Sequence, residues 1–398
     1  MGERRGRTGR RGAALLSIGG TALAATTLVI AGTVSAATAG PAPGPAPGKA
    51  PEKAPKAAEG AGHGAAAATG SPNASRFPLG DPDTVRAEDG RYVTYGTTVR
   101  AGRGQRCGGA RGRLHVPVLV HGSGDAERNG MADCASGDAL PGGPGSWAKS
   151  GPAVWAPGVA RYRGHYVMYY TAVRKGSAGK RCIGRAVAKS ARGPFRSAGL
   201  WSCPSGGRWA LDANPFVNGR SLYVTYRDDG VAKGAETGIS TVRTDSSGRA
   251  VRKTRRTALK STDIGWETRK NRGASAHIVE NPAMWRAADG RWYLMYSGNR
   301  WDSARYATGI ARCGRSPLPA SRCRPLQHGA RRPYFGFRGA AGVHPFRGLP
   351  QNHRGPGGMD VFTGADGRPH VVWHWWNGGV RHPMTGVLTR GAGGFSVS

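Results

Sequence analysis

One short phrase recurs five times along the chain: a turn that carries glycine, followed by a strand of aromatic and β-branched residues. An Asn-Gly or Asp-Gly turn between two apolar runs predicts a β-hairpin, because a type I′ turn needs positive φ at both central positions. The successive turn glycines are 74, 55, 71 and 77 residues apart. This quasi-regular repetition predicts an all-β fold, a five-bladed β-propeller. The glycines of the five turns are Gly90, Gly164, Gly219, Gly290 and Gly367.

Three acids precede these turns by about one strand length, and a propeller brings the inner strand of every blade to one central pocket. The acids are Asp81, Asp212 and Glu280, each followed within three residues by a proline. Proline suits a strand that begins at a channel edge, where no ladder donor is needed. Any one such segment alone is also ordinary turn chemistry. Three acids at equivalent positions of successive blades nevertheless predict a shared carboxylate site on the axis.

The N-terminal segment has the composition of an export signal. A basic stretch with five arginines before residue 12 precedes an apolar run from Ala13 to Ala31. Small residues then offer cleavage after Ala36 or after Ala39. We therefore expect a signal peptide over 1–36 and a secreted mature protein without a stable membrane anchor. An uncleaved anchor is the alternative.

The rest of the chain divides by composition into two parts. Residues 37–75 are mostly Ala, Pro, Gly and Lys, with almost nothing large and apolar. Such a segment cannot bury a core and is expected to be a disordered linker. The repeats fill the remaining 76–398, so we expect this stretch to be one propeller domain.

Cysteine usage agrees with export. Six cysteines fall inside the repeats, and an even number in an exported chain implies disulfides. Fifteen pairings are possible, and sequential pairing is favoured because each such pair would bracket one loop. The absence of a Cys-x-x-Cys pattern argues against structural zinc. The cysteines are Cys107, Cys134, Cys182, Cys203, Cys313 and Cys323.

The net charge of +35 raises the question of a nucleic-acid partner. Most of the excess is arginine scattered singly through a Gly/Ala/Arg-rich sequence, which indicates compositional bias rather than a basic face. The longest cluster, Arg252 to Arg256, is expected in a solvated loop between blades. We therefore predict no nucleic-acid partner. Adhesion to anionic cell-wall or plant polymers is a physically sensible side effect of the charge.

Taken in order, these segments resemble glycoside hydrolase family 43, whose members are secreted five-bladed propellers acting on arabinan, xylan and their side chains. The resemblance covers about 76–398. It is carried by Asp81-Pro82 before an aromatic hairpin, Trp155-Ala156-Pro157 before a tyrosine-rich strand, Leu211-Asp212 with a later Pro215, and Val279-Glu280-Asn281-Pro282.

The chain departs from the family pattern at the entrance to the last blade. Many members have Gly-Pro-Gly-His there, with the histidine often near a metal or water on the axis, whereas this chain has Gly355-Pro356-Gly357-Gly358. His374 and His353 occur nearby, but neither defines a metal site. We therefore predict no metal ligands and no required cofactor, and no residue pattern supports a structural calcium.

The resemblance implies a role for each acid. Glycoside hydrolysis needs a carboxylate to activate water and a carboxylic acid to protonate the leaving oxygen, roughly 6.5–9.5 Å apart in an inverting enzyme. By motif match, Asp81 is the general base and Glu280 the general acid. Asp212 would orient Glu280 and keep the pKa of that acid raised through like-charge proximity.

Sugar binding calls for flat aromatic faces and hydrogen-bonding groups. Trp155, Trp301 and Tyr306 are candidates for stacking on pentose rings, and Asn299 and His374 for hydrogen bonds. The alternative for each is a structural role, because propeller blades bury many aromatic side chains between their sheets.

These expectations combine into a secreted, inverting glycoside hydrolase for α-L-arabinofuranosyl or β-D-xylosyl linkages in plant cell-wall polysaccharide, with arabinan slightly favoured by the resemblance. We expect a monomer. A fructan-acting propeller glycosidase would instead favour a retaining arrangement with closer carboxylates. An alternative of a different class is a non-catalytic propeller that binds polysaccharide.

Overall fold

The computed structural model describes residues 73–102, 107, 112–121, 132, 134–229, 237–266, 278–303, 305–326, 332–336, 354–377 and 379–398. The chain divides into two units, residues 1–65 and 66–398, and every described residue belongs to the second. The predicted signal peptide, 1–36, and most of the predicted linker, 37–75, lie outside the described residues. Everything below concerns the second unit.

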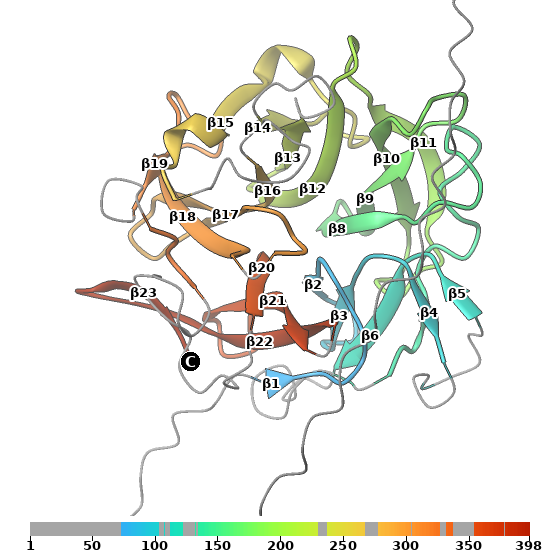
Figure 1. Ribbon diagram of the computed structural model, residues 1–398, viewed down its shortest axis with the longest axis horizontal. Helices are drawn as coiled ribbons and strands as arrows, with labels where there is room; N and C mark the ends of the chain where they lie inside the picture. The colour runs from blue at the N-terminus through green and yellow to red at the C-terminus, as the bar shows by residue number, and fades with distance from the viewer. Residues whose placement is uncertain are drawn as a thin grey trace, which may run out of the picture. The chain divides into compact units, whose positions relative to one another are not determined.

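The described strands form five antiparallel sheets arranged in a ring, a five-bladed β-propeller as predicted (Figure 1). The sheets stand side by side around the axis, with β2, β8, β12, β16 and β20 innermost. Blade 1 consists of β2 (Asp83–Arg86), β3 (Tyr92–Tyr95), β6 (Pro117–His121) and β7 (Gly137–Asp138). Blade 2 consists of β8 (Trp155–Tyr162), β9 (His165–Val173), β10 (Arg181–Ala188) and β11 (Arg196–Ser202).

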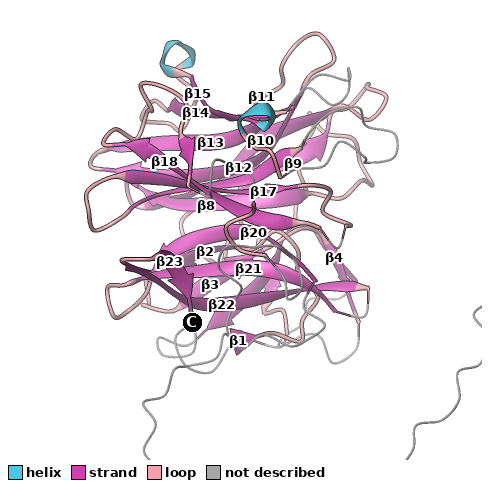
Figure 2. Ribbon diagram, turned by 60° about the vertical axis from the view of Figure 1, so that its left-hand side comes forward, coloured by secondary structure: helices cyan, strands magenta, loops and turns pink. Residues whose placement is uncertain are grey.

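The other three blades repeat this order. Blade 3 consists of β12 (Trp209–Asn218), β13 (Ser221–Asp229), β14 (Gly238–Arg243) and β15 (Arg256–Lys260). Blade 4 consists of β16 (Val279–Arg286), β17 (Trp292–Gly298), β18 (Ala307–Gly314) and β19 (Arg324–Pro325). Blade 5 contains β20 (Arg354–Thr363), β21 (Pro369–Asn377), β22 (Val380–Gly391) and β23 (Gly394–Val397). A separate hairpin, β4 (Val99–Ala101) with β5 (Gly112–Leu114), and two 3-10 turns, η2 (Arg252–Thr254) and η3 (Ser261–Asp263), complete the described elements (Figure 2).

The ring is closed by a strand from the N-terminal side of the domain. β1 (Asn73–Ala74) pairs antiparallel with β22, with Asn73 opposite Thr385, and Ser75 N donates to Pro383 O at 3.0 Å. The last blade therefore contains chain from both ends of the repeat region. β1 lies within the predicted linker, 37–75, because a two-residue strand gives no hydrophobic signal in the sequence.

The predicted hairpins all form, and each turn glycine has positive φ. Only the Arg163-Gly164 turn has positive φ at both positions, at 51° and 79°. In the Asp-Gly turns the aspartate is not left-handed, and its side chain accepts the backbone N–H two residues on, as Arg91 N donates to Asp89 Oδ1 at 3.1 Å. These are turns with a left-handed glycine at their end, so the type I′ prediction was wrong for them while the hairpin prediction was confirmed.

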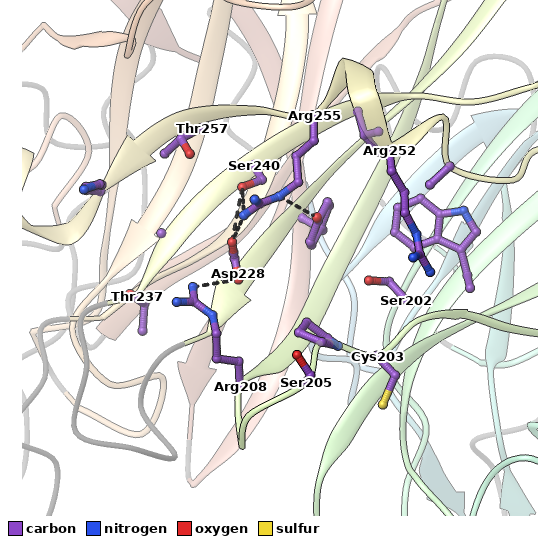
Figure 3. A pocket seen from close by; sticks show the side chains of 17 residues that line it. Ser202, Cys203, Ser205, Arg208, Asp228, Thr237, Ser240, Arg252, Arg255 and Thr257 are labelled. Carbon is purple, nitrogen blue, oxygen red and sulfur yellow. Dashed lines mark hydrogen bonds and ion pairs between the residues drawn. The ribbon is translucent and has the colours of Figure 1, made fainter. Parts of the chain in front are cut away.

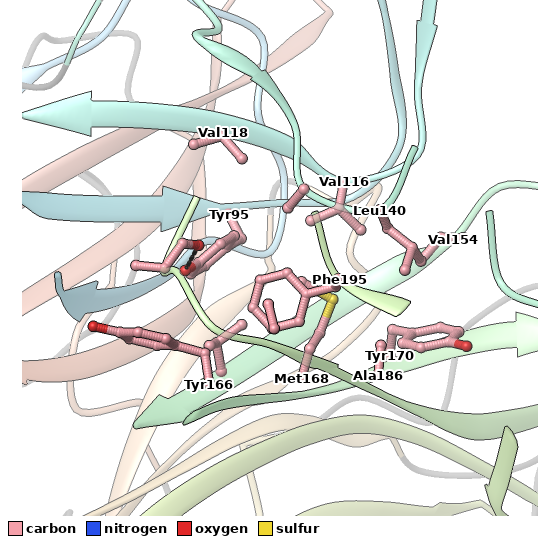
Figure 4. Close-up of a cluster of buried hydrophobic side chains, with 14 of the residues drawn as sticks. Tyr95, Val116, Val118, Leu140, Val154, Tyr166, Met168, Tyr170, Ala186 and Phe195 are labelled. Carbon is pink, nitrogen blue, oxygen red and sulfur yellow. Dashed lines mark hydrogen bonds between the residues drawn. The ribbon is translucent and has the colours of Figure 1, made fainter. Parts of the chain in front are cut away.

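Aromatic side chains of the second strands fill the space between neighbouring blades. Figure 4 shows Tyr95 and Val118 of blade 1 facing Met168 and Tyr166 of blade 2, with Phe195 between them. The Tyr95 and Phe195 rings meet edge to face, with centroids 6.2 Å apart. Close packing of these rings opposes sliding of one blade against the next. It therefore helps to set the position of each inner strand.

Three disulfides join neighbouring cysteines in sequence, Cys107–Cys134, Cys182–Cys203 and Cys313–Cys323, which confirms the sequential pairing. The first does not bracket a single loop, since β5 and β6 lie between its cysteines. Across the described part of the chain, no helix has the length and apolar character needed to span a membrane.

The contact between blades 2 and 3 depends on a glycine. A Cβ on Gly158 of β8 would lie 2.2 Å from Ala213 O and 2.7 Å from the Pro215 side chain. We expect Gly158→Ala to lower the free energy of unfolding by about 1–3 kcal/mol, measured by urea denaturation. Gly137→Ala in β7 is the matched control, because no atom lies within 4 Å of its added Cβ. Equal stability of the two variants would contradict close packing at Gly158.

Candidate active site

A left-handed residue lies at the same level of every blade, within the inner strand in blades 2 to 5 and two residues before β2 in blade 1. These residues have φ between 41° and 59°, and the strand register shifts by one step there in blades 2 to 5. The extra residue makes a bulge that turns its side chain toward the axis. The five bulge residues are Asp81, Ala156, Asp212, Asn281 and Gly358.

Each bulge N–H donates to a group of the preceding blade, so the bulges form a ring of hydrogen bonds around the axis. Four of the acceptors are side chains within three residues of the end of a blade's second strand. The four bonds run from Ala156 N to Thr97 Oγ1 (3.0 Å), from Asp212 N to Thr171 Oγ1 (3.1 Å), from Gly358 N to Ser297 Oγ (2.9 Å) and from Asp81 N to His374 Nδ1 (3.1 Å).

The fifth step, from blade 3 to blade 4, differs. Arg227 occupies the acceptor position in β13, opposite Leu211, and arginine has no acceptor. Asp212 Oδ2 instead accepts from Asn281 N at 3.3 Å, and the guanidinium of Arg227 binds Glu280. The ring thus changes its acceptor, from a second-strand side chain to Asp212, at the one step where two acids of adjacent blades meet.

Glu280 does not occupy the position of the other two acids. It lies one residue before the bulge, opposite Ser297 of β17, at the level of Leu211 in blade 3 and Trp155 in blade 2. The prediction that all three acids share an equivalent repeat position was therefore wrong for Glu280. Asn281 occupies the bulge position that Asp81 and Asp212 occupy in their blades. Because Glu280 lies one residue earlier, its side chain contacts Arg227.

A cavity of about 590 Å³ opens above this ring. All three acids line it, so the predicted convergence of Asp81, Asp212 and Glu280 is observed. Their positions come from blades 1, 3 and 4. The remaining described lining residues are aromatic, apolar or cationic apart from the amide Asn281: Trp155, Arg181, Trp209, Leu211, Arg227, Ile278, Asn281, Arg300, Trp301 and Arg381.

Asp81 is held as a carboxylate. Arg381 Nη1 lies 3.0 Å from both of its oxygens, and Thr97 Oγ1 donates to Oδ2 at 2.7 Å. Burial alone would raise the pKa of Asp81, but the charge of Arg381 and the Thr97 hydrogen bond outweigh it and hold the pKa below its usual value. An ionised carboxylate beside a cavity can accept a proton from water.

Asp212 is in the opposite state. Burial, followed by the negative charge of Glu280, raises the pKa of Asp212 to about 8, although the nearby Arg227 opposes the shift. Glu280 takes the ion pair with Arg227, and both side chains are only 9% exposed. Because the two carboxyl groups titrate together, the proton belongs to the pair, and at neutral pH the pair holds one. The raised pKa of Asp212 places more of this proton on Asp212, whereas the sequence predicted the raised pKa for Glu280.

Three predicted sugar contacts prove to be buried beneath the cavity. Tyr306 and His374 are fully buried, and their rings stack on each other with centroids 5.7 Å apart. Asn299 is 3% exposed and donates to Arg305 O at 2.8 Å. None of the three lines the cavity, so the prediction of direct sugar contact is corrected. They support the site from below: His374 bonds the Asp81 amide, and Asn281 Nδ2 bonds both Asp81 (3.2 Å) and the Tyr306 hydroxyl (2.9 Å).

The other two predicted contacts line the cavity wall. Trp301 is 46% exposed, and its ring stacks on Trp376 with centroids 5.6 Å apart. The Trp155 ring is covered by the Arg181 guanidinium, 3.2 Å from the ring centroid, and the same group lies 5.5 Å from Trp209. Each of these rings carries a cation, since the Arg381 guanidinium lies 5.0 Å from the Trp301 centroid. Trp301 nevertheless keeps nearly half of its surface exposed to the cavity side and to solvent.

A second polar layer lies on the axis around a small cavity of about 30 Å³. Asn214 Nδ2 donates to Asp83 at 3.2 Å and to Asp360 at 2.9 Å, which joins blades 1, 3 and 5. Burial and the charge of Asp360 raise the pKa of Asp83 well above its usual value. The other oxygen of Asp83 accepts Val159 N at 3.0 Å, so this layer fastens blades together.

Gly358 stands where the family pattern has histidine. Its φ is 59°, and an added Cβ would lie 2.7 Å from His374 Nδ1 and 3.3 Å from Asp81 Cα. Glycine thus lets His374 approach the base. His353 lies outside the described residues. Among the described residues, no group of three or more His, Cys, Asp and Glu side chains could hold a metal ion.

Sequence reasoning missed Arg227 and Arg381, since it treated the arginines as compositional bias. A signal for Arg227 existed. One position near the end of the second strand can be compared across the five blades. Four blades have a hydrogen-bond acceptor there and blade 3 has an arginine: Thr97, Thr171, Arg227, Ser297 and His374 in blade order. Arg381 gave no signal, because its contact with Asp81 joins opposite ends of the domain.

The raised pKa of Asp212 predicts a pH-dependent stability. Its folded value of about 8 exceeds the usual 3.8, so wild type loses stability as the pH rises between these values, by at most about 1.4 kcal/mol per pH unit. Asp212→Asn lacks this loss. We expect the melting temperature of Asp212→Asn, measured by calorimetry, to increase relative to that of wild type as the pH is raised from 4 to 8. Asp302→Asn, a change at an exposed residue, is the control, and a constant Asp212→Asn gap would contradict the assignment.

Comparison with known proteins agrees with this architecture. The family model described as Glycosyl hydrolases family 43 matches residues 78–328. No curated protein matches. The fold is similar to solved structures of an endo-arabinase from Bacteroides thetaiotaomicron (TM-score 0.60, 16% identity, covering 82% of this chain and 100% of that one) and an alpha-L-arabinofuranosidase from Lactobacillus brevis (0.59, 19%, 81% and 94%). A third is an endo-1,4-beta-xylanase, also from Bacteroides thetaiotaomicron (0.57, 18%, 82% and 97%).

The family match spans more than half of the chain and contains all three acids of the cavity. The chain is therefore a glycoside hydrolase that belongs to glycosyl hydrolase family 43.

Proposed function

We propose that the protein is a secreted, inverting glycoside hydrolase that cleaves α-L-arabinofuranosyl or β-D-xylosyl linkages in plant cell-wall polysaccharide, with arabinan as the favoured substrate. The observation that carries the proposal is the arrangement of three acids around one cavity. Asp81 is bound by Arg381 and Thr97, which lower its pKa, whereas Asp212 lies beside Glu280, whose charge adds to burial in raising the pKa of Asp212. Those are the two states that an acid-base glycosidase needs.

In the proposed reaction Asp81 takes a proton from the attacking water, and Glu280 gives one to the leaving glycosidic oxygen. The Asp212–Glu280 pair has that proton available, since a coupled pair moves it between carboxyl groups as their surroundings change. Arg227 holds the Glu280 side chain in the cavity wall and stabilises its carboxylate after the proton has left. The carboxyl groups and water carry both proton transfers, and we propose no required cofactor and no metal ligands.

The cavity has features that suit a pentose polymer. Trp301 presents an exposed ring on which a sugar can stack, and Arg181 and Arg300 offer donors for hydroxyl groups. Arabinan is favoured because two of the similar folds are an endo-arabinase and an arabinofuranosidase. The xylanase among them keeps xylan as the second choice.

Export and a monomeric state belong to the same proposal. The basic and apolar stretches before residue 36 have the order of a signal peptide. Three disulfides within one domain suit an oxidising compartment. A single chain supplies all three acids, so a monomer suffices for catalysis.

Removing either proton-transfer group tests the reaction. We expect Asp81→Asn and Glu280→Gln each to reduce kcat on arabinan by roughly 10²–10⁴-fold, the usual contribution of general acid-base catalysis, while the variants stay folded. Reducing-sugar release from arabinan, arabinoxylan and xylan is the measurement, with circular dichroism as the folding control. Full activity in either variant would refute its role, and release from none of the three polymers by wild type would refute the substrate class.

Arg381 gives a prediction about pH. Because its charge holds the pKa of Asp81 down, Arg381→Met should raise that pKa, and the acidic limb of the kcat/KM profile should move to higher pH. The matched control is Arg300→Met, which changes the same cavity but removes a cation that pairs with Asp302 at 2.9 Å. An acidic limb that moved equally in both variants would argue against Asp81 as the base.

A further inference from the structure

A second, larger cavity lies outside the axis, on the face of blade 3 that is turned toward β11 of blade 2 (Figure 3). Its volume is about 920 Å³. We call it the blade 3 groove. The described lining residues that determine its chemistry are Trp201, Arg208, Asp228, Arg252, Arg255 and Lys260. None of them belongs to the catalytic cavity.

The groove is strongly cationic. Four basic side chains face one carboxylate, so the groove keeps an excess of three positive charges. Figure 3 shows Arg208 and Arg255 reaching Asp228 from opposite sides. Arg208 Nη2 lies 2.8 Å from Asp228 Oδ1, and Arg255 binds the other oxygen and also Ser240 Oγ at 3.0 Å. Asp228 thus fixes two guanidinium groups in the floor, and Arg252 and Lys260 add charge that this carboxylate does not offset.

The basic run of the sequence is therefore built into a site in part. Arg252 to Arg256 was expected in a solvated loop between blades, but it lies within blade 3, in η2 and at the start of β15. All four basic side chains of this run are exposed, but only Arg252 and Arg255 line the groove. Lys253 and Arg256 carry the same charge outside it.

The groove shares a wall with the catalytic cavity. On β13, Arg227 faces the cavity and pairs with Glu280, while the next residue, Asp228, faces the groove. Likewise Trp209 lines the cavity and Arg208 the groove. Alternating side chains of one strand pair thus serve both sites at the same end of blade 3. The two sites therefore lie next to each other, on opposite faces of the same strand pair.

We propose that the blade 3 groove binds uronic acid residues of a polysaccharide, as a second binding site beside the catalytic one. Guanidinium forks match planar carboxylates, the hydroxyls of Ser202, Ser205 and Thr257 suit sugar hydroxyls, and Trp201 supplies an apolar face. The groove binds the charged part of the polymer whose neutral pentose linkages the cavity cleaves. The polysaccharide identity of the ligand rests on the proposed function, while the carboxylate chemistry rests on the groove alone.

Two double variants with equal charge test this proposal on the purified full-length protein. Arg252→Gln with Lys260→Gln removes two groove charges, and Lys253→Gln with Arg256→Gln removes two outward charges from the same run. The dissociation constant for oligogalacturonate is measured by calorimetry at moderate salt. We expect the groove variant to bind about tenfold more weakly, and the outward variant to change less than about twofold.

Separate readouts keep this test independent of the proposed function. Hydrolysis of neutral arabinan should be unchanged in the groove variant, and failure of wild type to cleave arabinan would leave the binding result valid. Equal weakening in both double variants would reduce the effect to net charge and overturn the site. The proposal would also be overturned if the groove variant lost affinity for a single-stranded oligonucleotide but kept it for oligogalacturonate.

Discussion

The ring of hydrogen bonds between bulges is the constraint on which the rest of this propeller depends. Every blade has, in or just before its inner strand, a left-handed residue whose N–H is accepted by a group of the preceding blade. These bonds fix the blades relative to one another at the axis and turn the bulge side chains into the cavity. A residue at the bulge position therefore both connects its blade to the preceding one and can take part in catalysis.

The changed acceptor in the ring explains the protonation of the site. Arg227 replaces an acceptor and draws Glu280 into an ion pair, so Asp212 must accept the Asn281 amide and share the neighbourhood of a second carboxylate. Burial and that neighbour keep a proton on the pair. Across the axis, Arg381 and Thr97 keep Asp81 ionised. Arg381 therefore favours Asp81 as a proton acceptor, and Arg227 leaves the Asp212–Glu280 pair as a proton donor. Hydrolysis of a glycosidic bond requires one group of each kind.

Much of the fold followed from the repeated hairpins, since a glycine turn and an aromatic strand are local features that the sequence displays directly. The three acids could be identified because each lies in a short motif. The one-residue offset of Glu280 could not, because it depends on where the bulge falls in β16. The burial of Tyr306 and His374 could not be predicted either. A period-two strand pattern does not distinguish a residue beneath the cavity from one that lines its wall. Arg381 meets Asp81 across 300 residues, and no local pattern reports such a contact.

The central claim is that at neutral pH one proton lies on the Asp212–Glu280 pair while Asp81 is ionised. Difference infrared spectroscopy of wild type against Asp212→Asn and Asp81→Asn, with isotope-labelled aspartate, tests it most directly. The account predicts that wild type and Asp81→Asn share at pH 7 a protonated aspartic acid band that Asp212→Asn lacks, in addition to the signal of buried Asp83 that all three proteins have in common. A band that survived in Asp212→Asn and vanished in Asp81→Asn would contradict it and would exchange the roles of the two aspartates.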